Sequence, residues 1–224
     1  MPETPEPSRV LLVDDHELLS GTVALALRQY GIEVHIAAGP SPAAIVDVAR
    51  RLAPVLVLLD LDLGPELGSG LDLIAPLIQA GSRVVMVTGS TDRAGLGACI
   101  EAGATGVVSK AVSFETLVAT VRRAAEGAPL LTDDERQALL DELRRQQRAD
   151  SERLAPFMAL SPREQAVLGR LVAGESAETI AARTYVSVAT VRSHIRAILM
   201  KLGVNSQLAA VALVRDAGWD PPER

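Results

Sequence analysis

Short apolar runs alternate with amphipathic stretches through the first half of this chain. The runs predict strands, at 9–14, 33–37, 55–60, 83–88 and 106–109. The stretches between and after them have apolar residues at helical spacing and predict helices, at 18–30, 42–52, 70–79, 92–101 and 113–126. Strands that alternate with helices in this way predict an α/β fold, a doubly wound five-stranded parallel sheet over residues 9–126.

The run VLVLLDLDLG, from Val55 to Gly64, is the centre of this pattern. An unbroken apolar run bounded by Pro54 and Gly64 is typical of a strand buried on both faces of a parallel sheet. Asp60 follows that strand, at the edge where open α/β sheets bind ligands. Taken alone, Asp60 is equally consistent with a residue that caps a turn.

The second half of the chain has a different pattern. Thr132 and Glu135 form a capping box that opens a charged helix running to about Ala149, with a looser join at 151–159. Its apolar positions are few, which favours a solvated linker helix over 127–157, with a dimerising coil as the alternative. Residues 158–219 contain a second capping box, Ser161 to Glu164, and predict four short helices, near 163–173, 177–183, 188–201 and 206–217. We predict an all-α module with a helix-turn-helix at its centre.

Composition and charge narrow the picture further. Cys99 is the single cysteine of the 224 residues, which excludes an internal disulfide. No apolar run approaches the roughly 20 residues of a membrane span, and no signal peptide is evident, so we expect a cytoplasmic protein without membrane contact. Residues 1–8 are rich in Pro and Glu and are expected to be disordered, and 220–224 form a tail. Formal net charge is −6 over 1–126, −2 over 127–157 and +2 over 158–224, which suggests two different roles.

Five side chains stand at the ends of predicted strands: Asp14, Asp15, Asp60, Thr88 and Lys110. Because parallel strands end on one edge of their sheet, these residues are expected to converge there. Three carboxylates repel one another unless a cation joins them, and Mg²⁺, which also accepts phosphate oxygens, suits this set. Lys110 is one of only two lysines among 22 basic residues, which favours a contact to an anion over a surface or helix-capping role. The cluster therefore indicates phosphoryl chemistry.

Two kinds of protein fit this cluster. The first is a haloacid-dehalogenase-type phosphatase, in which Asp60 is the nucleophile, Asp62 the acid and base, and Thr88 and Lys110 follow in the expected order. In that fold, however, the acidic metal pair normally follows the Lys, whereas Asp14 and Asp15 precede Asp60.

The second is a response-regulator receiver domain, which VLLVDDH, LLDLDLG, VVMVTGS and GVVSKAVS closely resemble. The resemblance implies that a sensor histidine kinase phosphorylates Asp60, while Asp14 and Asp15 help Asp60 to hold Mg²⁺. It also implies that Thr88 hydrogen-bonds the phosphoryl group and that Lys110 pairs with it.

One position departs from the receiver pattern. Receivers usually have Tyr or Phe three residues before the Lys, and that aromatic side chain swings inward when the Thr engages the phosphoryl group. This chain has Val107 there, and Ala111 replaces the Pro often found after the Lys. A phosphorylation-independent regulator of the same fold is therefore an alternative.

The stretch Ser187 to Leu202 predicts an amphipathic helix. One stripe is apolar, and the face opposite presents Arg192 and Arg196 among small residues, which suits entry into a major groove but also an ordinary solvated face. The stripe consists of Val191, Ile195, Ile198 and Leu202. We interpret His194, beside the stripe, as structural.

Residues 158–215 resemble a LuxR-type (NarL/FixJ) DNA-binding domain, through LSPREQAVLGRLVAG, SAETIAARTYVSVATVRSHI and ILMKLGV. The resemblance implies a recognition helix near 188–201 that binds double-stranded promoter DNA, with contacts from Thr190, Arg192, Ser193, Arg196 and Lys201. It also implies dimerisation through the last helix, with Leu208 and Val211 as candidate contacts. Both resemblances together identify a two-component response regulator that is a homodimer on DNA, with no enzymatic turnover.

Overall fold

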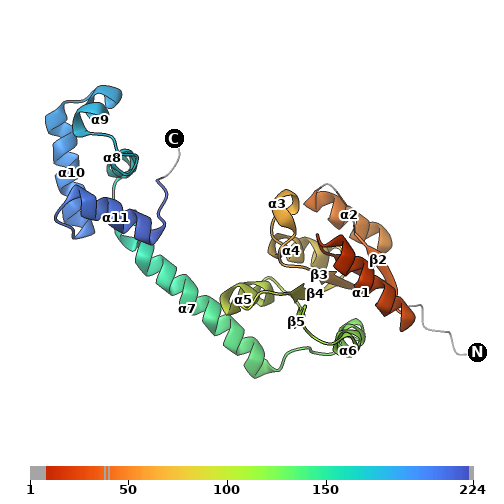
Figure 1. Cartoon of the computed structure of the whole chain (residues 1–224). Coiled ribbons are helices and arrows are strands. Elements are labelled where there is room, and N and C mark those ends of the chain that lie inside the picture. Colours follow the sequence, from red (N-terminus) through yellow and green to blue (C-terminus); the bar gives the residue numbers. More distant parts are fainter. Residues whose placement is uncertain (1–8, 38, 40, 222–224) are drawn as a thin grey trace, which may run out of the picture. The chain divides into compact units, whose positions relative to one another are not determined.

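The structure is a computed structural model that describes residues 9–37, 39 and 41–221. The chain divides into two compact units, residues 1–145 and 146–224, with the boundary inside one helix (Figure 1). The predictions for 1–8 and for 222–224 lie outside the described residues.

The first unit is built on a five-stranded sheet in which all neighbouring strands are parallel, in the order β2-β1-β3-β4-β5. The strands are β1 (Arg9–Val13), β2 (Glu33–Ile36), β3 (Leu56–Leu59), β4 (Arg83–Thr88) and β5 (Gly106–Ser109). Every residue of β3 is buried, as its unbroken apolar run predicted. The predicted doubly wound parallel sheet is therefore confirmed.

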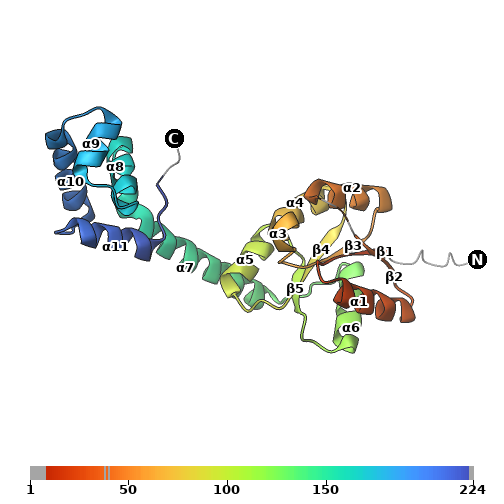
Figure 2. The same cartoon turned by 45° about the horizontal axis from the view of Figure 1, so that its top comes forward.

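Helices cover both faces of this sheet (Figure 2). On one face, α1 (Glu17–Gln29) and α6 (Phe114–Ala125) pack in one apolar cluster. On the other face lie α2 (Pro42–Leu52), α4 (Leu71–Gln79) and α5 (Arg93–Glu101). The loop after β3 contains the short helix α3 (Gly64–Leu67). The buried residues between the sheet and the helices on each face are mainly aliphatic, and this packing positions the ends of the strands.

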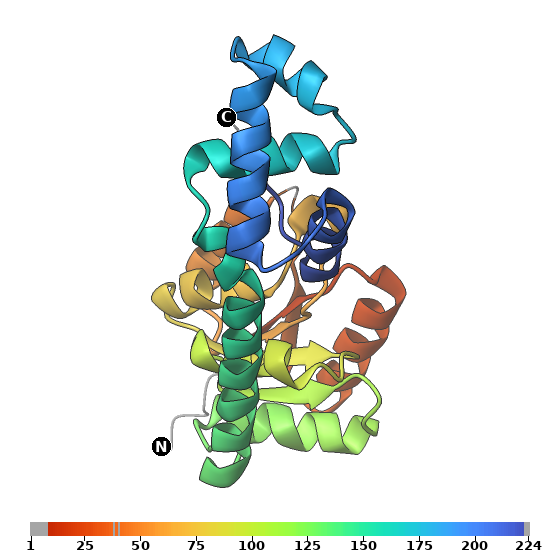
Figure 3. The same ribbon diagram turned by 90° about the vertical axis from the view of Figure 1, so that its left-hand side faces the viewer.

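The helix α7 (Asp133–Met158) differs from its prediction in two ways. It begins at the predicted capping box, in which the backbone N–H of Thr132 donates to Glu135 at 2.8 Å, but it runs unbroken to Met158 instead of ending near Ala149 (Figure 3). It is also not simply solvated. Leu139 and Leu143 are buried, and Leu139 belongs to the core cluster that contains α5. Up to Ala149 its only leucines are Leu139, Leu140 and Leu143, and they are enough to pack its first half on the first unit.

The second unit is all-α, as predicted. Four helices follow the end of α7: α8 (Pro162–Val172), α9 (Ala177–Thr184), α10 (Val188–Leu202) and α11 (Gln207–Ala217). Ser161 closes the predicted capping box with Glu164. Phe157, near the end of α7, is fully buried and stacks on Trp219 with ring centroids 5.1 Å apart. The core of this unit therefore includes the last turns of α7.

No single helix among the described residues is long and apolar enough to cross a membrane. Only when α10 and α11 are counted together, as a bent pair, do they reach the length and hydropathy of a membrane span. Both helices contribute residues to the core of the second unit.

Candidate functional site

The carboxyl edge of the sheet gathers the polar residues that the sequence placed at strand ends. Asp14 follows β1, Asp60 follows β3, Thr88 ends β4 and Lys110 follows β5. The ammonium Nζ of Lys110 lies 2.6 Å from Oδ2 of Asp60 and 2.8 Å from Oδ2 of Asp14. Residues about 50 and 100 positions apart thus converge at this edge, as predicted, and the structure shows that they form an ion-pair cluster.

A group of four side chains could hold a metal ion here. Oxygen or nitrogen atoms of Asp14, Asp15, His16 and Asp60 all lie within 4.8 Å of one another. Three of the four residues offer carboxylate oxygens, the donors that Mg²⁺ prefers, so the donor set fits that ion. His16 was absent from the sequence prediction. Its Nδ1 lies 2.6 Å from Oδ1 of Asp15. His16 follows Asp14 and Asp15 directly in the sequence, and this position could have identified it as a further candidate ligand.

The space beside this cluster is open. A cavity of about 530 Å³ is lined by Asp15 and by the turn that contains Gly64 and Ser69. Gly64 has a φ of +75°, and a Cβ there would stand 3.3 Å from Oδ2 of Asp15. Glycine at this position therefore keeps the approach to Asp15 clear and suits the backbone of the turn.

Burial and Lys110 shift the pKa of the Asp60 carboxyl in opposite directions. Burial raises the pKa of the Asp60 carboxyl, and the hydrogen bond and charge of Lys110 reduce that rise. Burial alone would lower the pKa of Lys110, but its hydrogen bonds to Asp14 and Asp60 outweigh burial and raise it. The other oxygen of Asp60, Oδ1, accepts the backbone N–H of Leu61 at 2.7 Å. The carboxylate is thus fixed in orientation beside a cation that stays charged.

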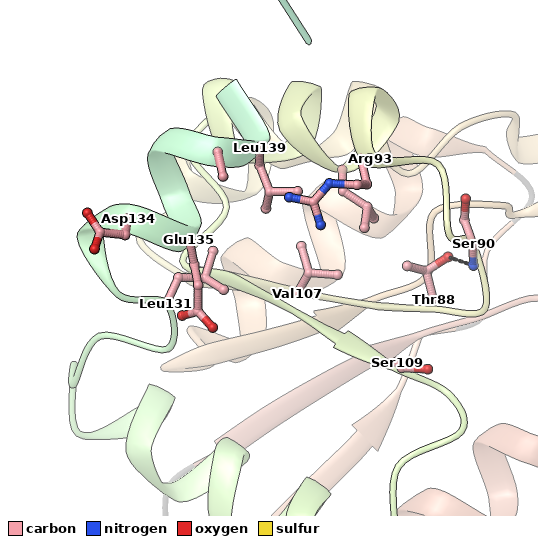
Figure 4. A pocket seen from close by; sticks show the side chains of 11 residues that line it. Thr88, Ser90, Arg93, Val107, Ser109, Leu131, Asp134, Glu135 and Leu139 are labelled. Atoms are coloured by element: carbon pink, nitrogen blue, oxygen red, sulfur yellow. Dashed lines mark hydrogen bonds between the residues drawn. The ribbon is translucent and has the colours of Figure 1, made fainter. Parts of the chain in front are cut away.

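Thr88 is buried near this cluster, and its Oγ1 accepts the backbone N–H of Ser90 at 3.0 Å. A cavity of about 510 Å³ begins at Thr88 and Ser90 and extends over Val107 to α7 (Figure 4). Its far wall includes Leu131 and Leu139. Space therefore remains around the position where receivers usually have an aromatic side chain.

Asp62, the acid and base of the phosphatase hypothesis, lies outside the cluster. It is exposed, and its Oδ1 accepts the backbone N–H of Gly64 at 3.1 Å. The carboxylate thus stabilises the turn before α3, which gives it a structural role.

The helix α10 of the second unit has the predicted faces. Val191, Ile195, Ile198 and Leu202 are buried. Thr190, Arg192, Ser193 and Arg196 are exposed, on the same helix. The apolar stripe is confirmed, and the contacts of the exposed face with DNA stay a prediction.

Two ion pairs of this unit escaped the sequence prediction because their partners are far apart along the chain. Nη2 of Arg192 donates to Oε1 of Glu178, on α9, at 3.0 Å. Lys201 donates to Oε2 of Glu164, on α8, at 2.7 Å. Its ammonium therefore joins the end of α10 to the start of α8, a structural role beside the predicted phosphate contact.

The two candidate dimer contacts differ in exposure. Leu208 on α11 is 80% exposed, whereas Val211 is half-buried against the core of its own unit. Leu208 is thus the more available of the two for a partner. Dimerisation through this helix stays a prediction.

Comparison with known proteins gives the same two parts. Residues 10–122 match the response regulator receiver domain, and residues 158–214 match the luxR family of bacterial regulatory proteins. The chain is 35% identical over 216 residues to the nitrate/nitrite response regulator protein NarP of Escherichia coli K12, covering 95% of this chain and 96% of NarP. It is 33% identical over 208 residues to a nitrate/nitrite response regulator protein homolog of Haemophilus influenzae, covering 92% and 95%.

Solved structures agree with this similarity. A LuxR-family two-component response regulator from Aurantimonas has 27% identity and a TM-score of 0.51, covering 61% of this chain and 97% of that one. The RcsB response regulator of Salmonella typhimurium has 21% identity and a TM-score of 0.50, covering 94% and 98%, and supports the fold alone.

Proposed function

This chain belongs to the response regulators that join a receiver domain to a LuxR-type DNA-binding domain, and we propose that phosphorylation of Asp60 controls its binding to promoter DNA. The observation that carries the proposal is the cluster in which Lys110 lies 2.6 Å from Asp60 beside Asp14. Such a site binds a phosphoryl group with a fixed cation already in place.

The roles of the residues follow from their positions. A carboxylate oxygen of Asp60 attacks phosphorus, and its new P–O bond forms as the P–N bond to a histidine of the sensor kinase breaks. Lys110 then pairs with the phosphoryl oxygens, and the hydroxyl of Thr88 donates to one of them. Asp14, Asp15 and Asp60 would hold Mg²⁺, with His16 beside them, and the ion would neutralise charge on the transferring group.

The second unit supplies the DNA contacts in this proposal. Arg192, Ser193 and Arg196 face the major groove, and Thr190 lies at the start of α10 near the phosphates. The active form is a homodimer joined through α11 on a two-fold related site. We expect a cytoplasmic regulator whose only chemistry is its own phosphorylation and slow hydrolysis.

The test is phosphorylation of the full chain with acetyl phosphate and Mg²⁺, read by intact mass and by oligomeric state on the same samples. Wild type should gain one phosphoryl group and shift toward dimer, and Asp60→Asn should show neither change. Glu66→Gln is the matched control, since it removes a nearby exposed carboxylate that lies outside both the cluster and the lining of the cavity beside it, and it should behave as wild type.

Other outcomes decide against parts of the proposal. No adduct on wild type would favour a phosphorylation-independent regulator, a second candidate that Val107 motivates. An adduct without a change of oligomeric state would show a site that is phosphorylated but not coupled to dimerisation.

The pair of Arg192 with Glu178 leads to a further prediction. A DNA phosphate or base must compete with the Glu178 carboxylate for this guanidinium, so Glu178→Gln should tighten binding to random-sequence duplex DNA by about two- to fivefold at low salt. Fluorescence anisotropy at several salt concentrations measures this. Glu152→Gln removes the same charge from an exposed position of α7 and should leave affinity unchanged. Equal affinities of wild type and Glu178→Gln would contradict the competition.

A further inference from the structure

The first turns of α7 rest on α5 in a contact that leaves no room for a side chain at Gly97. A Cβ on Gly97 would overlap the carbonyl oxygen of Leu139 and would lie 3.0 Å from Cβ of Leu143. The backbone of Gly97 is not in the left-handed region, so its conformation does not require glycine. What requires glycine at this position is the close approach of α7.

The leucines of this contact are well covered. Leu139 is 7% exposed and Leu143 is 8% exposed, in a helix whose other residues are mostly exposed. Cys99 and Ile100, from the same helix as Gly97, belong to the apolar cluster that includes Leu139. The contact is therefore part of the folded core of the first unit.

A chain of hydrogen bonds joins Thr88 to the start of α5. Oγ1 of Thr88 accepts the backbone N–H of Ser90, and Oγ of Ser90 accepts the backbone N–H of Asp92 at 3.2 Å. The carboxylate of Asp92 then caps α5 by accepting the backbone N–H groups of Ala94 and Gly95. A displacement of Thr88 thus acts on the helix that carries Gly97.

A cavity lies on the side of Thr88 that faces α7. The cavity of about 510 Å³ separates Thr88 from Leu139, and Val107 lies between them (Figure 4). An aromatic side chain in place of Val107 would fill part of this space. The other large apolar side chains that line it are Leu96, on α5, and Leu131 and Leu139, before and within α7.

We propose that the α5–β5 face is a docking surface for the first turns of α7, and that phosphorylation of Asp60 releases α7 from it. The proposal rests on the proposed function. When Thr88 turns toward the phosphoryl group, its link to Ser90 is broken, and the segment 89–92 and α5 shift. Because the contact at Gly97 has no spare room, a small shift of α5 removes it. The docked helix α7 thus takes the part that an aromatic side chain at position 107 has in other receivers.

Hydrogen exchange of the full chain, followed by mass spectrometry, tests this. In wild type, acetyl phosphate with Mg²⁺ should make amides 137–145 exchange roughly tenfold faster. Gly97→Ala should show that faster exchange without a phosphodonor, because its methyl group cannot fit under Leu139. Gly21→Ala is the matched control, as Gly21 is also helical but has nothing within 4 Å of its Cβ position, and it should behave as wild type.

Cys99 distinguishes release of α7 from unfolding. It is the only cysteine, it is fully buried, and burial raises the pKa of its thiol to about 11, so it should stay unreactive toward thiol reagents while the domain is folded. Gly97→Ala should therefore combine fast exchange at 137–145 with an unreactive Cys99.

The outcomes separate this inference from the proposed function. An adduct on Asp60 with unchanged exchange at 137–145 would overturn the release of α7 and leave phosphorylation control in place. Slow exchange in Gly97→Ala, or a reactive Cys99, would overturn the docking surface. The absence of an adduct would overturn phosphorylation control, and the inference would fall with it.

Discussion

Replacing both Arg192 and Arg196 with alanine should weaken binding to a specific DNA site by about 2–6 kcal/mol, enough to abolish it in most assays. Each arginine that reads a base contributes about 1–3 kcal/mol, and these two are exposed on the face of α10 opposite its buried stripe. The measurement uses the phosphorylated full chain and a duplex selected from a random pool by the wild-type protein.

The matched control is Arg148→Ala. Arg148 is exposed on α7, outside both the proposed recognition face and the proposed dimer helix α11, and its loss should change affinity little. The single variants separate base contacts from phosphate contacts. If an arginine reads a base, its alanine variant should discriminate less between DNA sequences. If it contacts phosphate, its variant should bind all sequences more weakly and show a smaller salt dependence of binding. Unchanged affinity in the double variant would exclude this face of α10.

Glu164→Gln should lower the free energy of unfolding of the second unit by about 2–3 kcal/mol at pH 7. The hydrogen bond from Lys201, against some opposition from burial and with help from Ser161, lowers the pKa of the Glu164 carboxyl from 4.5 to about 2. The side chain of Lys201 is 40% exposed, so solvent screens the ion pair and reduces its contribution to stability. Because the folded pKa is the lower one, this stability is fully present above about pH 4.5. It is lost as the pH falls from there through 2.

Trp219 provides the measurement, because it is the only tryptophan of the chain and lies in the core of this unit, against Phe157. Denaturant unfolding followed by its fluorescence, in wild type and Glu164→Gln at pH 7 and pH 3, should show a difference in stability that shrinks at the lower pH. Glu152→Gln, an exposed change on α7, should stay within about 0.5 kcal/mol of wild type. A constant difference at both pH values would show that the ionised carboxylate contributes nothing.

The strands, the edge that gathers Asp14, Asp60 and Lys110, and the buried stripe of α10 could all be predicted, because each depends on periodicity or on chain topology. Val191 and Ile195 lie one turn apart, so the helix itself aligns them. The contacts that could not be predicted are those in which neither partner has a local signature. Glu178 and Arg192, or Gly97 and Leu139, become neighbours only through tertiary packing. In the sequence, a glycine within a helix indicates only weak helix propensity, and a single leucine among charged residues does not indicate a buried contact.

The helix α7 contributes Leu139, with Leu140 packed beside it, to one core and Phe157 to the other. The segments that match the two families, 10–122 and 158–214, therefore each leave out part of a core. The first ends before Leu139, and the second begins after Phe157. A fragment cut at either limit would expose apolar surface that the intact chain covers. Recombination that exchanges one half of the chain between related proteins would disturb the same packing. An exchange of either half preserves packing only if all of α7 is inherited with compatible surfaces at both of its ends, so the linker evolves under two sets of steric constraints at once.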